Sequence, residues 1–494
     1  MSPLYPTLCS VCALAALLSG CNRAGRPEEA TLRIGLGLGR SAQVGALSSL
    51  TDRLYAEPLV ALDALGRPMA RLAQRWNWED NGMTLRVVLR NGTKLHDGRT
   101  LDDGMARRFL QARITALRER KHYGAFDRVS SIEIPDSRTL LLRLTEPDAF
   151  LIPELNNADI VDPQAPDVGT GPFRLISRTP VTAQRFEHHH RGAPAIGQVR
   201  IATYDSRRAA WAALMRGEVD AAHEVNPDSV EFLERTPGLQ TFGSLRPYYW
   251  ALSFNVRHPQ LESADVRRAL SLAVNREEVV ASVLRGYGAV ASDPVWPLFW
   301  AYPNTSDAHP YDPAAARELL NRAGVAKAGS AKLRFRCLFY GEDPQFERMA
   351  LLVQRQLSEV GVELELQPVS MNQMLSKMGA GEFDSFLMMF HSGRALDWTY
   401  RFWRSPRASE QALQATGYIG ADDVLDQLRG SYADPEVREG VLELRKRFYD
   451  DPPAVFIAWQ RAIRAVSTRF DVSDVGEQDV FANIWQWKPV PDRK

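Results

Sequence analysis

Two stretches of the chain carry residue types suited to binding a cofactor or a metal. Gly37, Gly39 and Ala42 follow an alternating apolar run and match G-x-G-x-x-A, in which glycines admit a pyrophosphate to a helix N-terminus. The match is isolated, because Glu57 has the spacing of the required acidic residue but precedes a proline inside the next element. A cofactor-binding enzyme that uses Gly37–Ala42 is therefore the minor hypothesis, and we expect no cofactor.

His188, His189 and His190 form the second stretch. In a strand, neighbouring side chains point to opposite faces, so at most His188 and His190 could share a metal ion. No cysteine or carboxylate stands at a ligand spacing around them. We interpret the run as a solvated strand end and expect no metal. The sequence also contains no G-x-S-x-G elbow, P-loop or H-E-x-x-H pair, so nothing in it predicts catalysis.

Cys21 directly follows a short apolar run. Val11 to Leu18 is too short to cross a bilayer, which takes about 20 residues, but has the length of a signal-peptide core. Leu18-Ser19-Gly20-Cys21 resembles the bacterial lipobox, although no Lys or Arg precedes the apolar run. We expect residues 1–20 to be removed as a signal peptide, Cys21 to carry the lipid, and residues 21–30 to tether an exported body to a membrane. The alternative is a secreted protein with an unmodified cysteine.

Composition bounds the class of protein. The 494 residues include 60 Lys and Arg and 60 Asp and Glu, so the balanced charge gives no reason to expect a nucleic-acid partner. A chain longer than about 300 residues exceeds what one core supports, which predicts two or more domains. Removal of Cys9 and Cys12 and acylation of Cys21 would leave Cys337 alone in an apolar run, where we expect it to be buried.

The pattern of elements changes along the chain. The first third is rich in strands, with a hairpin predicted at Asn91-Gly92 and a strand pair turning at Pro135-Asp136-Ser137. In the second half helices and strands alternate, which indicates an α/β layout with parallel sheet. The helix starts carry capping residues, namely Asp312, Asp343, and Asn275 with Glu278 at a capping-box spacing.

Val168 to Phe173, "VGTGPF", resembles the G-T-G-P-[FY] signature of the family 5 extracellular solute-binding proteins, the peptide-binding receptors of ABC importers. Further matches follow in order from about Leu32 to about Val466. They are the "LAQRW" segment that ends at Trp76, His96-Asp97-Gly98, Gly217 with Asp220, and Asn255, Arg267, Ala269, Ala273 and Arg276.

The resemblance implies an α/β, two-lobed periplasmic-binding-protein-like fold of class II with a hinged cleft. The first lobe would comprise residues 31–50, 169–250 and 470–494, with an extra subdomain at 51–168, and the second lobe residues 251–469. The strand "YYWALSFNV" would cross between the lobes, and the chain would return near Arg469. The resemblance further implies a monomeric receptor, not an enzyme, at the periplasm or cell surface, which passes a peptide or other small solute to an ABC permease.

Binding positions are also implied by the resemblance. The family aspartate that holds a peptide's α-amine corresponds to Asp397, followed by Trp398, with Leu396 where alanine is usual. Arg394 departs from the pattern, and it would either neutralise Asp397 or recognise a ligand carboxylate. A carboxylate in a closed, water-free cleft would bind a cation more strongly than at the surface.

Backbone groups of two segments would pair with an extended ligand. These are Gly37, Leu38, Gly39 and Arg40, and Gly393 to Ala395. Trp459 matches an aromatic position in the family's cleft, with core packing as the alternative. Because the family also contains binders of nickel chelates, haem, sugars and opines, a non-peptide ligand remains the alternative.

Overall fold

The structure, a computed structural model, describes residues 30–38, 44–119, 124–303, 309–325, 333–407, 413–472 and 478–491. Cys21, with the predicted signal peptide and most of the tether, and Gly39 and Arg40 lie outside these residues. Within the described ranges, no helix combines the length and the apolar character needed to cross a membrane.

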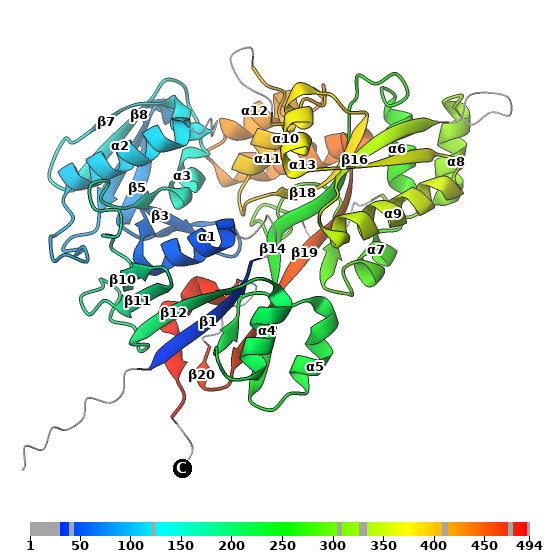
Figure 1. The fold of residues 1–494 in the computed structure, drawn as a ribbon. Coiled ribbons are helices and arrows are strands. Elements are labelled where there is room, and N and C mark those ends of the chain that lie inside the picture. The colour runs from blue at the N-terminus through cyan, green and yellow to red at the C-terminus, as the bar shows by residue number, and fades with distance from the viewer. Residues whose placement is uncertain are drawn as a thin grey trace, which may run out of the picture.

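One large sheet runs through the molecule (Figure 1). Its strands are β1 (Thr31–Gly37), β10 (Phe173–Arg178), β11 (Val181–Arg185), β12 (Gln198–Tyr204), β13 (Ala221–Ala222), β14 (Leu239–Phe254), β15 (Gly288–Val290), β16 (Arg334–Tyr340), β17 (Glu363–Val369), β18 (Ser385–His391) and β19 (Ala454–Ser467). Their order is β10-β11-β12-β1-β13-β19-β14-β18-β16-β17, with β15 paired to β19. The predicted parallel pairing is confirmed, because β1 lies parallel to β12 and β13, and β16 lies parallel to β17 and β18.

The antiparallel pair β14 and β19 joins the two halves of this sheet. Its register runs from Leu239 opposite Ser467 to Ser253 opposite Ala454. At one end β19 pairs with β13, and at the other end β14 pairs with β18. The pairing is interrupted between Leu245 and Tyr249, where the strand leaves one half for the other. We call the half around β1 the first lobe and the half around β16 the second lobe.

Helices cover both faces of the sheet. The first lobe carries α1 (Val44–Tyr55), α4 (Arg207–Met215), α5 (Val230–Glu234) and the short helix η5 (Val480–Gln486). In the second lobe, one face packs against α6 (Ala264–Leu272), α7 (Arg276–Ser282), α8 (Pro313–Arg322) and α9 (Pro344–Glu359). The opposite face packs against α10 (Met371–Ala380), α11 (Asp397–Trp403), α12 (Asp422–Arg429) and α13 (Asp434–Asp450).

A separate four-stranded sheet forms the subdomain. It has the order β5 (Ala73–Glu79), β6 (Thr84–Leu89), β8 (Thr139–Leu144) and β7 (Val129–Glu133), and it packs against α2 (Asp103–Glu119) and α3 (Leu151–Glu154). Two short pairs complete it: β2 (Glu57–Pro58) with β9 (Asp159–Ile160), and β3 (Val60–Leu62) with β4 (Pro68–Ala70). Its apolar core is continuous with that of the second lobe.

The hairpin predicted at Asn91-Gly92 is wrong. Strand β6 pairs with β5 on one side and β8 on the other, so the residues after Gly92 find no free edge. The reversal lies instead between β5 and β6, at Asp80 to Gly82, which all have left-handed φ. The second predicted turn, at Pro135-Asp136-Ser137, is confirmed by the antiparallel pairing of β7 and β8.

The predicted helix caps are confirmed. The carboxylate of Asp312 accepts the N–H groups of Ala314 and Ala315 at 3.0 and 2.9 Å, and Asp343 caps α9 in the same manner. Asn275 accepts the N–H of Glu278 at 3.0 Å. The reciprocal half of that capping box is absent among the described contacts, because the Glu278 carboxylate accepts a hydrogen bond from Gln356 at 2.7 Å instead.

Two of the quoted motifs contact each other. Nε2 of the His96 ring lies 2.9 Å from the carbonyl oxygen of Gly171, and the backbone N–H of His96 donates to the carbonyl of Gly169. A Cβ on Gly169 would lie 2.1 Å from the carbonyl oxygen of Tyr55, and one on Gly171 2.5 Å from its carbonyl carbon. These glycines are therefore required by close approach of the chain at the end of α1, a contact that a turn motif alone does not predict. Cys337 is buried, as predicted.

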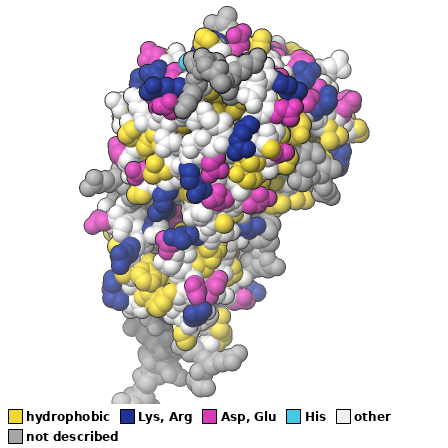
Figure 2. Space-filling view, turned by 90° about the vertical axis from the view of Figure 1, so that its right-hand side faces the viewer, with side chains coloured by type: hydrophobic (Ala, Val, Ile, Leu, Met, Phe, Trp, Pro, Cys, Tyr) yellow, Lys and Arg dark blue, Asp and Glu magenta, His cyan; other side chains and the backbone are white. Residues whose placement is uncertain are grey.

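On the surface shown in Figure 2, acidic and basic side chains are interspersed with apolar ones over the described residues. This distribution agrees with the balanced charge of the sequence.

Two arginines of α13 offer a test of the packing. Arg445 binds Asp293 at 2.9 Å with both side chains at most 4% exposed, whereas Arg447 pairs with Asp423 and Glu443 at the surface. Arg445→Gln should lower the free energy of unfolding by about 3–5 kcal/mol, because it leaves a buried charge unpaired. Arg447→Gln should lower it by at most about 1 kcal/mol. Equilibrium urea unfolding measures both, and equal losses would contradict this packing.

Candidate functional site

The loop that follows β18 and the start of the next helix hold half of the predicted binding residues, and the loop is anchored at its beginning. The hydroxyl of Ser392 donates to the carbonyl of Pro294 at 2.9 Å, and the backbone N–H of Ser392 donates to the carbonyl of Pro247. Gly393 has φ +69°, and a Cβ there would lie 2.9 Å from the Trp398 ring. Helix α11 then begins at Asp397. The loop thus makes a tight turn that fixes the start of α11.

Asp397 lines a cavity of about 370 Å³ between the subdomain and the second lobe. This volume lies within the range of about 300–1,000 Å³ that is usual for small-molecule sites. Gly124, Glu154 and residues between them in the subdomain form one wall, and the second lobe contributes Asp397, Phe402, Gln414 and other residues of the same two segments. The lining includes Glu154, Asp148, Phe150, Tyr400, Arg128 and Arg401.

The Asp397 carboxyl group is 4% exposed, and no described side chain forms an ion pair with it. Burial, reinforced by the charge of Glu154, raises the pKa of Asp397 to about 7, although Arg401 acts in the opposite direction. Burial also raises the pKa of Glu154, which accepts the N–H groups of Ala125 and Phe126 at 2.9 and 3.2 Å. Two buried carboxyl groups with raised pKa values therefore share one cavity, which is an environment that favours a cationic ligand group.

The basic residues of the cavity are already engaged. Arg128 binds Glu146 at 2.6 Å and Asp148 at 3.1 Å, and Arg404 binds Asp426 at 3.0 Å. Arg401 stacks over the ring of Trp398 at 4.5 Å. The arginines of the cavity wall therefore have acidic or aromatic partners, and Arg401 also lowers the pKa values of Asp397 and Glu154.

Arg394 faces different surroundings from Asp397. Burial and the charge of Arg53 lower the pKa of Arg394, while the charges of Asp479 and Asp63 act in the opposite direction. These residues belong to the first lobe and the subdomain, and no ion pair joins Arg394 to Asp397 among the described side chains. The arrangement therefore separates the two residues that the sequence places three positions apart.

The loop of Arg394 also meets the subdomain. A Cβ on Gly66, in the turn between β3 and β4, would lie 1.9 Å from the carbonyl oxygen of Arg394. Beside this contact, Trp296 donates its indole N–H to the carbonyl of Ala64 at 3.0 Å, and Arg67 binds Asp434 at 2.6 Å. The subdomain and the second lobe are therefore in direct contact next to the cavity.

Of the predicted binding segment from Gly37 to Arg40, the structure describes Gly37 and Leu38. Gly37 is buried, and a Cβ there would lie 2.3 Å from the backbone nitrogen of Arg207, so close packing accounts for this glycine. Leu38 donates its N–H to the carbonyl of Tyr204. Trp459 is 2% exposed and packs against Tyr249 and Trp296, with ring centroids 5.1 and 5.6 Å apart, which are contacts of a core residue.

A charged cluster beside the crossing strands was not predicted from the sequence. Glu224, just after β13, lies 3.2 Å from Arg207 and 3.5 Å from Arg246. Burial alone would raise the pKa of Glu224, but the surrounding arginines outweigh it and hold the pKa below its usual range. Arg464 on β19 binds Asp479 from the C-terminal segment. In the sequence, the feature that could have indicated this cluster is the charged segment "HEVN", which directly follows a short strand.

Comparisons with known proteins agree with this architecture. The family model "Bacterial extracellular solute-binding proteins, family 5 Middle" matches residues 67–409. The glutathione-binding protein GsiB of Salmonella paratyphi A is 26% identical over 366 residues, which cover 70% of each protein.

Two solved structures resemble the fold. NikA from Brucella suis in complex with Fe(III)-EDTA has a TM-score of 0.81 at 20% identity, covering 92% of this chain and 100% of its own. AppA from Bacillus subtilis in complex with a nonapeptide has a TM-score of 0.73 at 20% identity, covering 94% and 99%. The predicted two-lobed α/β fold is confirmed.

The raised pKa of Asp397 gives a pH-dependent prediction. Since the folded-state pKa of about 7 exceeds the unfolded value of about 3.9, stability is lost as pH rises through this window. Asp397→Asn removes the loss, so at pH 7.5 it should raise the free energy of unfolding of the ligand-free protein by up to about 4 kcal/mol. At pH 4.5 the gain should be small.

Urea unfolding at the two pH values measures this difference. Asp434→Asn serves as the control, because the carboxylate of Asp434 pairs with Arg67 at the surface and its pKa is lowered. The control should lose at most about 1 kcal/mol at pH 7.5. Destabilisation by Asp397→Asn at pH 7.5 would contradict the assignment.

Proposed function

The chain belongs to the bacterial extracellular solute-binding proteins of family 5, and we propose that it captures a small peptide-like solute and delivers it to the permease subunits of an ABC importer. The observation that supports this proposal most is the cavity in which Asp397 and Glu154 are buried together. A peptide's α-amine is a cation of the size and charge that two such carboxyl groups accept. The relative that binds glutathione, a short peptide, supports the same ligand class.

Capture in this site requires no covalent chemistry. A bound ammonium group would keep Asp397 ionised, and exclusion of water would strengthen the pair. The subdomain and the second lobe contribute opposite walls of the cavity, so their separation would open it and their contact would enclose the solute. Motion at the interrupted stretch of β14, between Leu245 and Tyr249, would allow such opening without loss of secondary structure.

Arg394 has a distinct role in the proposal. Its guanidinium group lies apart from Asp397, among charges of the first lobe and the subdomain. We infer that it recognises a carboxylate at the far end of the solute, together with the backbone of Gly393 and Ala395. The Gly37 to Arg40 segment would approach the solute from the first lobe.

The two ends of the solute can be tested separately. Removal of one partner from a desolvated ion pair costs about 3–5 kcal/mol, so Asp397→Asn should weaken binding by a factor on the order of 100 or more. Arg394→Gln should weaken a ligand with a free carboxylate to a similar degree and leave its amide derivative unaffected. Arg447→Gln, a change in a surface pair within the second lobe, is the matched control.

Isothermal titration calorimetry measures these affinities, with the solute that mass spectrometry identifies on gently purified protein. Full affinity of Asp397→Asn would overturn the amine site. A retained nickel chelate, haem, sugar or opine would redirect the proposal to a non-peptide ligand, and stabilisation by NAD would favour the cofactor hypothesis.

The N-terminus supports a second part of the proposal. We propose that acylated Cys21 anchors the exported receptor to a membrane, with residues 21–30 as the tether. Cys21→Ser should leave the precursor uncut or release the protein into the soluble fraction, because the thiol that accepts the lipid is gone. Cell fractionation with metabolic labelling by a fatty acid measures both effects. Cys337→Ser is the control, and membrane association of a cleaved Cys21→Ser protein would contradict the anchor.

A further inference from the structure

The histidine run adopts a conformation that differs from the predicted strand end. Strand β11 ends at Arg185, and two turns follow, closed by hydrogen bonds from the N–H of His189 to the carbonyl of Phe186 and from the N–H of Gly192 to the carbonyl of His189. Gly192 takes φ +98° in the second turn. These turns direct the adjacent side chains of His189 and His190 to the same place, whereas His188 is exposed.

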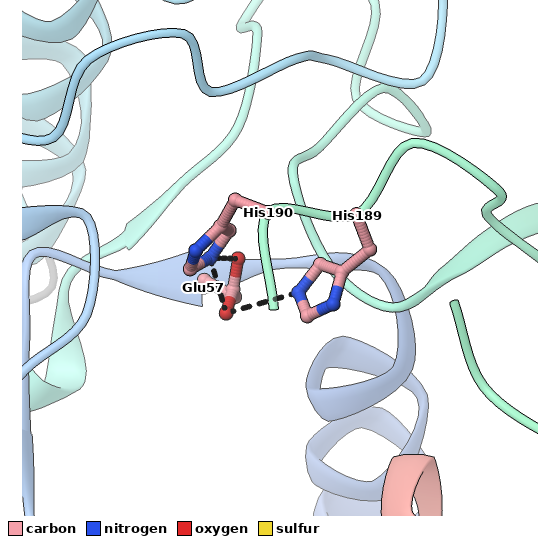
Figure 3. A group of neighbouring side chains, drawn as sticks. All are labelled: Glu57, His189 and His190. Atoms are coloured by element: carbon pink, nitrogen blue, oxygen red, sulfur yellow. Dashed lines mark hydrogen bonds and ion pairs between the residues drawn. The ribbon is translucent and has the colours of Figure 1, made fainter. Parts of the chain in front are cut away.

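Glu57 of β2 meets both imidazoles (Figure 3). Its carboxylate oxygens lie 3.4 Å from Nε2 of His189 and 3.0 Å from Nε2 of His190. One ligand atom from each of the three side chains can be chosen so that all lie within 4.8 Å of one another. The three side chains are 8% exposed or less. The residues around the histidine run contain no carboxylate at a ligand spacing, and this carboxylate therefore comes from Glu57, which is far away in the chain.

The hydrogen bonds around this cluster leave a place for a cation. Nδ1 of His189 lies 3.2 Å from the carbonyl oxygen of Gly192, so that a proton on Nδ1 is held there. Nε2 then presents its lone pair to the Glu57 carboxylate, and it is a buried atom without a hydrogen-bond partner in the described structure. With this tautomer, a cation between Nε2 and the carboxylate would satisfy both groups. An imidazole oriented through its second nitrogen by a backbone carbonyl is the usual arrangement of a metal ligand.

We propose that Glu57, His189 and His190 bind a single divalent transition-metal ion of the zinc class where the first lobe meets the subdomain. Two imidazole nitrogens and a carboxylate are donors that Zn²⁺ and its neighbours in the first transition row accept. Oε1 of Glu57 lies 3.4 Å from Nε2 of His189 and 3.2 Å from Nε2 of His190, and Oε2 lies 3.0 Å from Nε2 of His190. Bidentate binding by Glu57 would therefore supply four donor atoms from three side chains. The ion would join β2 to the turns after β11 and so stabilise this junction.

The charged neighbours bear on the strength of the site. Arg71 and Arg191 lie within range of the Glu57 charge, and so does the buried Asp159 on β9. Because two arginines already offset the carboxylate, the affinity should be lower than that of a structural zinc site with four protein ligands.

Isothermal titration calorimetry tests this site. Zn²⁺ is titrated into ligand-free protein from which a chelator has removed any bound metal. The wild type should bind one equivalent. The affinity should fall at least about 10-fold to 100-fold in each of Glu57→Gln, His189→Gln and His190→Gln. Replacing a residue that only supports a metal ligand already causes a loss of about that size. His188→Gln is the matched control and should bind as the wild type does. Absence of binding to the wild type, or equal weakening by His188→Gln, would overturn the site.

X-ray absorption on the zinc-loaded wild type provides a readout that needs no variant to fold. Scattering from two imidazole ligands is expected, and fewer than two would overturn the proposal. Asp397→Asn should bind Zn²⁺ as the wild type does, which separates this site from the proposed solute cavity. Loss of zinc binding in that variant would place the ion in the cavity instead and contradict the assignment to Glu57.

Discussion

The pairing of β14 with β19 is the constraint on which the rest of the molecule depends. These two strands are hydrogen-bonded to each other and to both halves of the sheet, so they fix how the first lobe faces the second. The interruption between Leu245 and Tyr249 lies at the junction, and Pro247 accepts a hydrogen bond there from Ser392 of the binding loop. A change in twist at this interruption would therefore move the loop that carries Arg394 and Asp397.

Burial of acidic groups next to the cavity has an energetic consequence. Burial raises the pKa values of Asp397 and Glu154, and the charge of Arg401 offsets only part of this rise. Under the proposed function, such a site gives up stability in the ligand-free protein for affinity, because a cationic ligand group would supply the missing interaction. The ion pair of Arg445 with Asp293 illustrates the opposite case, a buried charge that is fully matched inside the second lobe.

Local sequence signals predicted local structure, and contacts between distant segments limited the prediction. Asp312 and Asp343 identified helix starts correctly, because a cap depends on neighbouring residues. Asn91-Gly92 failed, because β6 already pairs with β5 through the turn that precedes it and with β8 from a distant part of the chain. Asp397 was identified through a family motif, but Glu154 was not, since nothing in its local sequence refers to α11. The histidine run failed for the same reason, because Glu57 is 133 residues from His190.

We propose that the cavity beside Asp397 holds the free amine of a small peptide-like solute. Calorimetric titration of the ligand-free wild type with a set of di- and tripeptides, each paired with its N-acetyl derivative, is the most direct test. At least one free peptide should bind, and its acetylated twin, which lacks the charged amine, should bind at least about 100-fold more weakly. Equal affinity for the two members of every pair that binds would rule out the amine site.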